Sequence, residues 1–242
     1  MAPEPRFLTA EWRNLAMLNF EIDPAILKER VPAGCELDSW DGRSLVSVIG
    51  FQFLKTRVRG ISIPFHRNFE EVNLRFYVRR KVDGEWRRGV VFVKELVPRR
   101  AIAMAARGLY GENYVALPMR HFVDRGAEGG LTTLAYEWRR NGEWEGLSLS
   151  FSGLPSIPLD DTEETFITEH YWGYSRQNDR RTVEYQVEHP RWRVWRAVAP
   201  GLSCDVASLY GPEFAGALSD SPRTAFVADG SAIVVRRGRR LT

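Results

Sequence analysis

The chain has 242 residues, of which 44% are hydrophobic and 27% are charged, and its formal net charge at pH 7 is +3. This composition is typical of a soluble globular protein that can bury a sizeable core. A membrane span is excluded because no run approaches the roughly 18 apolar residues that it needs, and residues 1–17 lack the pattern of a signal peptide.

The cysteines and the basic residues narrow the chemistry further. Cys35 and Cys204 have no metal-ligand spacing, so we expect buried thiols in a reducing compartment and a cytoplasmic location. The chain has 30 arginines but only four lysines, at positions 28, 55, 81 and 94. Amine chemistry therefore has few candidates, whereas a pocket lined by arginine would favour an anionic ligand.

The first half of the chain is predicted to be mainly strand. Residues 12–22 are predicted as a strand, and Asp23-Pro24 begin a short helix that Pro32 ends. Three Asx-Gly pairs join runs rich in β-branched and aromatic residues, and they lie at 41–42, 83–84 and 141–142. Such pairs favour two-residue hairpin turns and so predict an antiparallel sheet.

The segment from 89 to 121 has the layout of a pocket wall. A buried strand is predicted at 90–96, a small-residue helix at 101–109 and a further strand at 115–119. The polar corner Glu112-Asn113-Tyr114 precedes that last strand. A rigid strand and helix with a polar corner between them suit a ligand pocket.

The C-terminal part contains one more predicted helix, which Asp161 or Thr162 caps. Residues 182–199 are predicted as a strand that Pro190 interrupts, and the Gly-, Ser- and Pro-rich residues 199–222 as irregular. The last strand, 224–237, is predicted to be split by an Asp-Gly turn. The fold class that follows is α+β and β-rich: an antiparallel β-barrel or strongly bent sheet with two or three short helices, in one domain over 1–242.

Several of these features together are familiar from a known family. They are the segments 19–51, 89–96, 101–116 and 164–175, followed by a strand that ends in His189-Pro190-Arg191-Trp192. In this succession the chain resembles the YqjF-like family of uncharacterised conserved proteins (domain of unknown function 2071), which is itself similar to acetoacetate decarboxylase. The resemblance implies an acetoacetate-decarboxylase-like fold with a ligand cavity inside the sheet.

The resemblance also implies where the chemistry differs. Acetoacetate decarboxylase uses a lysine that forms a Schiff base, and Tyr114 stands approximately at that position here, while the nearby arginine is kept as Arg107. Arg13 matches the decarboxylase's cavity arginine, whereas its cavity glutamates have no counterpart in the matching strand. Tyrosine supplies no amine, so Schiff-base decarboxylation is not expected.

Residues on predicted strand faces supply further candidates. Glu71, Asn73, Arg75 and Tyr77 share one face of a strand, which is either a solvated face or a cavity wall with Arg75 as a carboxylate ligand. Lys94 shares a face with apolar neighbours, where burial would make it a nucleophile unless the strand end is exposed.

His189 continues an inward-facing pattern and is either a core histidine or a general base. Tyr171 lies beside His170 on the second predicted helix, where the pair would cover a pocket mouth or pack in the core. The remaining histidines have no metal spacing, so no metal or other cofactor is predicted. The arginines among tryptophans at 176–196 are interrupted by acids, so we expect no nucleic-acid partner.

Three functional hypotheses remain. The preferred one is a cavity that binds a small anionic or carbonyl-bearing organic molecule, with charge from Arg13, Arg75 and Arg107 and aromatic walls from Tyr110, Tyr114 and Tyr171. The second is an enzyme that acts on a keto acid by acid–base chemistry, with Tyr114 or His189 as proton carrier. The third is a scaffold for protein interaction, and a homo-oligomer is left open.

Overall fold

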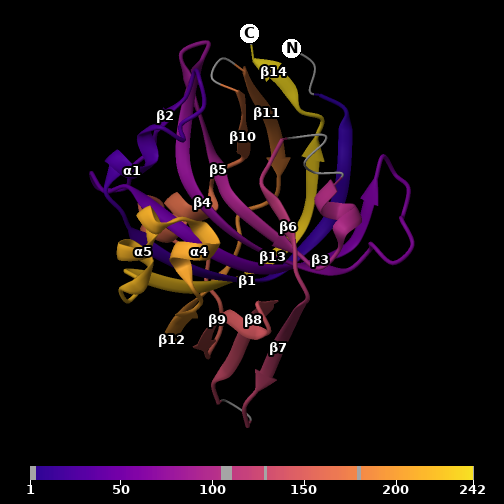
Figure 1. The fold of residues 1–242 in the computed structure, drawn as a ribbon, viewed down its shortest axis with the longest axis vertical. Coiled ribbons are helices and arrows are strands. Elements are labelled where there is room, and N and C mark those ends of the chain that lie inside the picture. Colours follow the sequence, from indigo (N-terminus) through magenta and orange to yellow (C-terminus); the bar gives the residue numbers. More distant parts are fainter. Residues whose placement is uncertain (1–3, 105–110, 128–129, 179–180, 242) are drawn as a thin grey trace.

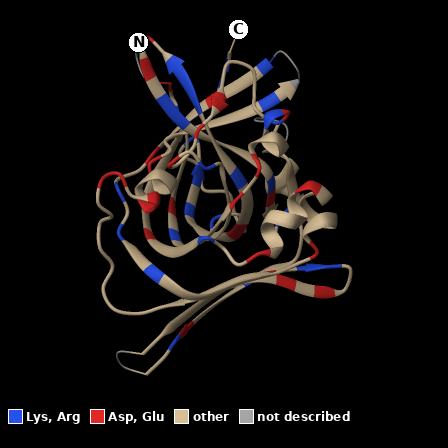
Figure 2. Ribbon diagram, turned by 90° about the vertical axis from the view of Figure 1, so that its left-hand side faces the viewer, with Lys and Arg blue, Asp and Glu red and all other residues tan. Residues whose placement is uncertain are grey.

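The computed structural model describes residues 4–104, 111–127, 130–178 and 181–241. Its main feature is a long, strongly curved sheet (Figure 1). Seven strands form the curve: β1 (Arg6–Glu21), β3 (Leu45–Val58), β4 (Phe69–Val82), β5 (Glu85–Val97), β10 (Trp172–Asn178), β11 (Arg181–Glu188) and β13 (Thr224–Arg236). Their order is β11-β10-β5-β4-β3-β1-β13, and β11 also pairs with β13. The strands therefore curl round a common interior (Figure 2).

Further strands extend this sheet at its ends. β12 (Val194–Ser203) pairs with β13 and carries the order on through β9 (Glu143–Phe151), β8 (Thr132–Arg140) and β7 (Met119–Arg125). These last three strands project below the curve in Figure 1. The short strands are β2 (Glu36–Leu37), β6 (Tyr114–Ala116) and β14 (Arg239–Leu241). The predicted fold class is thus confirmed as a strongly bent, mainly antiparallel sheet.

Two of the three predicted hairpins form at their Asx-Gly pairs. At Asp41-Gly42 the turn carries an isolated bridge between Trp40 and Arg43 rather than a strand pair, because β2 pairs with β4 and β3 pairs with β1 and β4. Asp83 and Gly84 have φ values of 52° and 89°, and Asn141 and Gly142 have 51° and 91°. Positive φ at both central residues matches the right-handed twist of the strands. The β4–β5 and β8–β9 hairpins follow directly.

The helices cover the sheet at a few places. They are α1 (Pro24–Lys28), α3 (Glu163–Thr168), α4 (Val206–Tyr210) and α5 (Pro212–Ser219), and residues 100–104 are also helical. Asp23 caps α1 and Thr162 caps α3, as predicted. The helices of the described residues are all short, and none has the length and apolar content that crossing a bilayer requires.

Two predictions about the C-terminal part are wrong. The region 199–222 is not irregular, because Asp205 caps α4 and Pro212 begins α5. Asp229-Gly230 is no turn, because β13 runs through it. Gly230 has φ +77°, and a Cβ there would lie 2.0 Å from the carbonyl oxygen of Trp12 on β1, so glycine permits a close approach of two strands.

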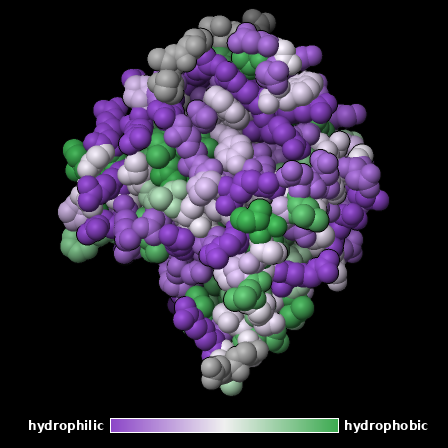
Figure 3. Space-filling model, turned by 180° about the vertical axis from the view of Figure 1, so that it is seen from behind, coloured by the Kyte–Doolittle hydropathy of each residue, from purple (hydrophilic) through white to green (hydrophobic). Residues whose placement is uncertain are grey.

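Side chains are buried on both faces of the curved sheet. Along β3, Val46 and Val48 join an outer core with α4, α5 and β8, while Ile49 and Phe51 join an inner core with α3. Burial on both faces explains the continuous apolar run of this strand. The surface seen from behind is mostly hydrophilic, with hydrophobic groups toward its lower half (Figure 3).

Candidate functional site

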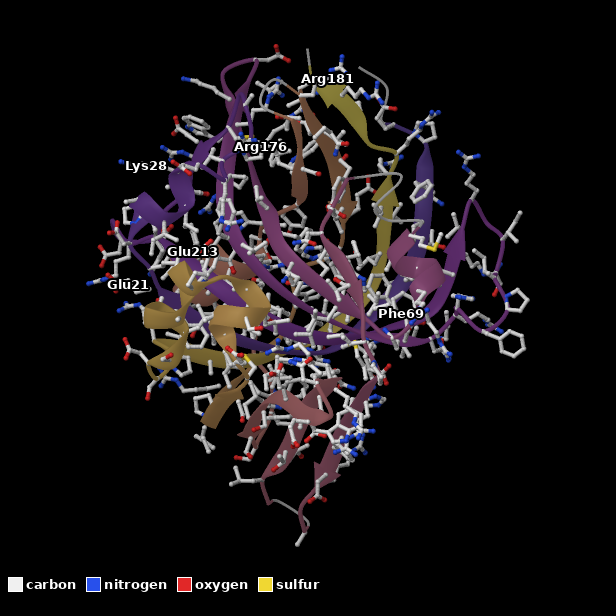
Figure 4. The ribbon with its side chains drawn as sticks, viewed as in Figure 1. Glu21, Lys28, Phe69, Arg176, Arg181 and Glu213 are labelled. Carbon is white, nitrogen blue, oxygen red and sulfur yellow. The ribbon has the colours of Figure 1, made fainter. Side chains whose placement is uncertain are left out.

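A cavity of about 300 Å³ lies inside the curve of the sheet. That volume is at the lower end of the roughly 300 to 1,000 Å³ of ligand pockets. Most of its lining is apolar, and its aromatic residues include Phe7, Trp12, Phe51, Phe53, Phe69, Phe92, Trp172 and Trp192. Phe69, labelled in Figure 4 near the beginning of β4, stacks on Phe53 with ring centroids 4.7 Å apart. The cavity thus suits a ligand with an apolar body and offers it few polar contacts.

Alternation along β4 brings three polar side chains into the cavity. Glu71, Asn73 and Arg75 all line it, because successive residues of a strand point to opposite faces. From the sequence, this face of β4 could either be exposed to solvent or line a cavity. In the structure it lines the cavity.

A bulge in β5 decides which of its residues join them. Leu74 pairs with Lys94 but Arg75 pairs with Phe92, so β5 has one extra residue at this point. The cavity face accordingly changes from Phe92 to Glu95. Lys94 turns outward and donates a hydrogen bond to the carbonyl oxygen of Leu209. Burial lowers the pKa of Lys94, but its amine faces away from the cavity.

Three carboxyl groups meet in the cavity, and with Tyr114 and Tyr185 we call them the acid wall. Glu71, Glu95 and Glu112 are 3%, 1% and 9% exposed, and no salt bridge joins them to a cation in the described part of the chain. Burial raises the pKa of Glu71 to about 8 and that of Glu112 to about 7, and it raises the pKa of Glu95 well above its usual value. The matched strand supplies none of these glutamates, as expected, because Glu71 lies on β4, Glu95 on β5 and Glu112 in the connection before β6.

The two tyrosines donate to these carboxyl groups. Tyr185 donates from its hydroxyl to Glu112 Oε1 at 2.6 Å, and Tyr114 donates to Glu71 Oε2 at 3.4 Å. Burial, together with the neighbouring carboxyl groups, raises the pKa of Tyr114 well above its usual value. Tyr114 therefore keeps its proton at neutral pH and acts as a hydrogen-bond donor.

One oxygen of this wall and one of the neighbouring Asn73 have no partner among the described residues. Asn73 Nδ2 donates to Glu71 Oε1 at 3.2 Å, but Asn73 Oδ1 and Glu95 Oε2 have no hydrogen-bond partner among the described residues. Buried polar atoms normally have partners, so these are the atoms that a ligand would satisfy. The described residues contain no cluster of three or more acidic, histidine or cysteine side chains arranged to hold a metal ion.

The positive charge in the cavity comes from Arg75, and we call Arg75, His170 and His189, which all line the cavity, the arginine wall. One guanidinium nitrogen of Arg75 donates to the carbonyl oxygen of Ile167 at 3.0 Å, and its Nε is buried without a partner among the residues described. No carboxylate forms a salt bridge with Arg75 within the described ranges. This guanidinium can therefore receive an anion.

Both histidines of this wall are neutral. Burial lowers the pKa of each to about 4, and positive charge adds to this effect, from Arg88 and Arg75 at His170 and from Arg75 at His189. Asp38 at His170 and the carbonyl of Pro190 at His189 act in the opposite direction. His170 Nε2 lies 3.3 Å from Asp38 Oδ2, and the His189 ring stacks on Trp192 with centroids 4.1 Å apart. They extend the wall as neutral polar groups.

The predicted site residues divide between the cavity and the surface. Arg75, Tyr114 and His189 line the cavity. Arg13 lies outside it, where it pairs with Glu11 at 3.2 Å, and Tyr171 also lies outside and donates to Glu169. Arg107 and Tyr110 fall outside the described residues and stay predictions.

Comparison with known proteins identifies the family of this chain. The family model DUF2071, described as "uncharacterized conserved protein", matches residues 9–232. The chain belongs to this family. The uncharacterized protein YqjF of Bacillus subtilis (strain 168) is 25% identical over 192 residues, which cover 78% of this chain and 75% of YqjF. The family resemblance predicted from the sequence is confirmed.

Solved structures share the fold at low identity. Acetoacetate decarboxylase from Legionella pneumophila has a TM-score of 0.68 at 11% identity, covering 100% of this chain and 90% of its own. The enduracididine biosynthesis enzyme MppR complexed with pyruvate has a TM-score of 0.66 at 12% identity, covering 100% and 92%. An acetoacetate decarboxylase-like enzyme from Sphingomonas wittichii RW1 has 0.63 at 14%, covering 98% and 94%. The DUF2071 chain therefore has an acetoacetate-decarboxylase-like fold.

Proposed function

We propose that this protein binds a small organic carboxylate with a carbonyl group and an apolar body. The observation that carries the proposal is Arg75, a partly buried guanidinium in the cavity wall that has no acidic partner among the described residues. An unpaired charge in an apolar cavity is costly, and a carboxylate that bonds with the guanidinium removes that cost.

The acid wall is the reason for proposing a carbonyl group in the ligand. Carboxyl groups with a raised pKa retain protons near neutral pH and can donate hydrogen bonds. The hydroxyl groups of Tyr114 and Tyr185 are donors as well. A carbonyl oxygen accepts hydrogen bonds and donates none, so it complements such a set.

The names of the fold relatives point to the same ligand class. One structure is that of an acetoacetate decarboxylase, and another is complexed with pyruvate; both molecules are small oxo acids. Because Lys94 faces away from the cavity and no other lysine lines it among the described residues, binding is proposed without a Schiff base.

Calorimetric titration with pyruvate, acetoacetate and 4-methyl-2-oxopentanoate tests the proposal. We expect the branched compound to bind most tightly, because it fills more of the apolar cavity. Arg75→Met is expected to weaken binding roughly 10- to 100-fold, the value of a charge-assisted hydrogen bond. Arg13→Met, outside the cavity, is the matched control and is expected to bind as wild type.

Two results would count against the proposal. One is the absence of binding for all three acids by wild type. The other is equal affinity of the Arg75→Met and Arg13→Met variants for an acid that does bind, since the carboxylate would then sit elsewhere. Native mass spectrometry of freshly purified protein gives an independent check for a retained small acid.

A further inference from the structure

We infer that the acid wall catalyses keto–enol exchange of a bound oxo carboxylic acid, with Glu112 as the base and Glu95 as the acid. This inference rests on the proposed function, because Arg75 must first hold the carboxylate. It adds a reaction type and two catalytic residues to a binding site.

Strand pairing places the acid and the base next to each other. β6 runs parallel to β5 with Tyr114 opposite Glu95, and the Glu95 amide donates to the carbonyl oxygen of Asn113 at 3.1 Å. Glu112 comes directly before this contact and lines the same cavity. On the other side of β5, Glu95 pairs with Asn73 of β4, two residues from Glu71. The acid wall is therefore assembled from three neighbouring segments.

Their mutual repulsion gives the carboxyl groups different protonation states. Three carboxyl groups this close in an apolar cavity cannot all ionise, so some stay protonated near neutral pH. Tyr185 donates to Glu112 at 2.6 Å, and a hydrogen bond of this kind favours the carboxylate form. Glu95, 1% exposed and with one oxygen unpaired among the described residues, favours the neutral acid. One carboxylate and one carboxylic acid therefore face the same space.

The unpaired atoms show where a ligand fits. A protonated Glu95 presents an O–H group whose oxygen, Oε2, meets no acceptor in the described part of the cavity. A carbonyl oxygen of the ligand supplies that acceptor. Carboxylic acids kept neutral by an apolar site act on carbonyl groups in this way in other enzymes.

The proposed step conserves atoms and electrons without a cofactor. The Glu112 carboxylate removes a proton from the carbon next to the ligand's carbonyl group, and the electron pair of that C–H bond forms a C=C bond. The carbonyl π electrons move to the oxygen, which takes the proton of Glu95. The product is the enol, with Glu112 protonated and Glu95 ionised, and the reverse step restores the oxo acid. In D2O the proton that Glu112 has taken up exchanges with solvent deuterium before the reverse step, so the carbon then acquires deuterium.

Proton NMR in D2O with 4-methyl-2-oxopentanoate tests the inference. Wild type is expected to speed the loss of the C3 proton signal well beyond the rate in buffer. Glu112→Gln and Glu95→Gln are each expected to slow it about 100-fold or more, the usual worth of a positioned acid or base. Both are near-isosteric, so affinity by calorimetry is expected to stay within a few-fold of wild type. Glu85→Gln, an exposed position on β5, is the control.

The outcomes separate the inference from the proposed function. Binding of the acid with no exchange above the buffer rate overturns the inference and leaves the proposed function standing. Wild-type exchange in both glutamine variants overturns the assignment of Glu112 and Glu95. Failure of wild type to bind any of the three acids removes the proposed function and this inference with it.

Discussion

Replacing Glu71 by glutamine is expected to stabilise the protein, and increasingly so as the pH rises. Burial raises the pKa of Glu71 from the usual 4.5 to about 8. A carboxyl group whose folded-state pKa is raised contributes stability that is complete below the unfolded-state pKa and is lost as the pH rises through the folded-state pKa. One pKa unit corresponds to about 1.4 kcal/mol, so up to about 5 kcal/mol is lost between pH 4.5 and 8. Glutamine avoids this loss because it never ionises.

The adjacent residue provides a contrast of opposite sign. Glu70 lies on the outer face of β4, 2.7 Å from His121 Nδ1. Burial alone would raise the pKa of Glu70, but the hydrogen bond with His121 brings it below the usual value. Stability from a lowered pKa is present above the unfolded-state pKa and is lost as the pH falls. Glu70→Gln is therefore expected to destabilise the protein at pH 7.

Urea unfolding curves at pH 4.5, 7 and 8.5 measure both effects. The Glu71→Gln variant is expected to match wild type at pH 4.5 and to exceed it at pH 8.5, with Glu85→Gln as an exposed control unchanged throughout. If Glu71→Gln is no more stable than wild type at pH 8.5, the folded-state pKa of Glu71 is not raised and its carboxyl group is already ionised at neutral pH. That result would refute the acid wall as a set of proton-bearing groups.

Three further predictions concern the scaffold. Burial raises the pKa of the Cys204 thiol to about 12, so a disulfide reagent at pH 8 is expected to label it slowly in native protein and rapidly in urea. Gly230→Ala is expected to destabilise by 2 kcal/mol or more, on the order of an overpacked core, whereas Gly216→Ala on the open side of α5 is expected to stabilise by about 0.5 to 1 kcal/mol in thermal unfolding. Glu184→Gln leaves three arginines around a neutral amide, at 2.7 to 3.1 Å, and is expected to cost about 3 kcal/mol by urea unfolding.

Local chemistry explains how much of the fold is predictable. The β4–β5 and β8–β9 hairpins follow from Asx-Gly pairs, because few residues other than Asn, Asp and Gly adopt positive φ at low cost. The same dipeptide at 229–230 gives a wrong prediction. Glycine is required there because β1 approaches Gly230 closely, and the local sequence does not show this contact. The two short helices after residue 205 are missed because glycine, serine and proline suit caps and first turns as well as loops.

The site is less predictable than the fold because it depends on strand register. Alternation along β4 correctly places Arg75 and Glu71 on one face, since that strand is regular up to Arg75. On β5 the same rule fails, because the bulge opposite Leu74 and Arg75 exchanges the facing of Lys94 and Glu95. Glu112 lies in the connection before β6, where no periodicity exists. Its proximity to Glu95 is a long-range contact, and only the assembled sheet defines it.

The register of β4 also determines how a ligand would lie between the two walls. Arg75 and Asn73 are successive residues of one strand face, so their Cα atoms are about 7 Å apart, and Glu95 lies opposite Asn73. A carboxylate held by Arg75 thus leaves the carbonyl group next to it on the side of Glu95. Because different groups hold the two ends, Arg75 substitutions should raise the ligand concentration needed for half-maximal exchange, whereas Glu95 substitutions should lower the rate at saturation. If substitutions at both positions instead change both the half-maximal concentration and the rate at saturation, the two walls do not act on one molecule in this way.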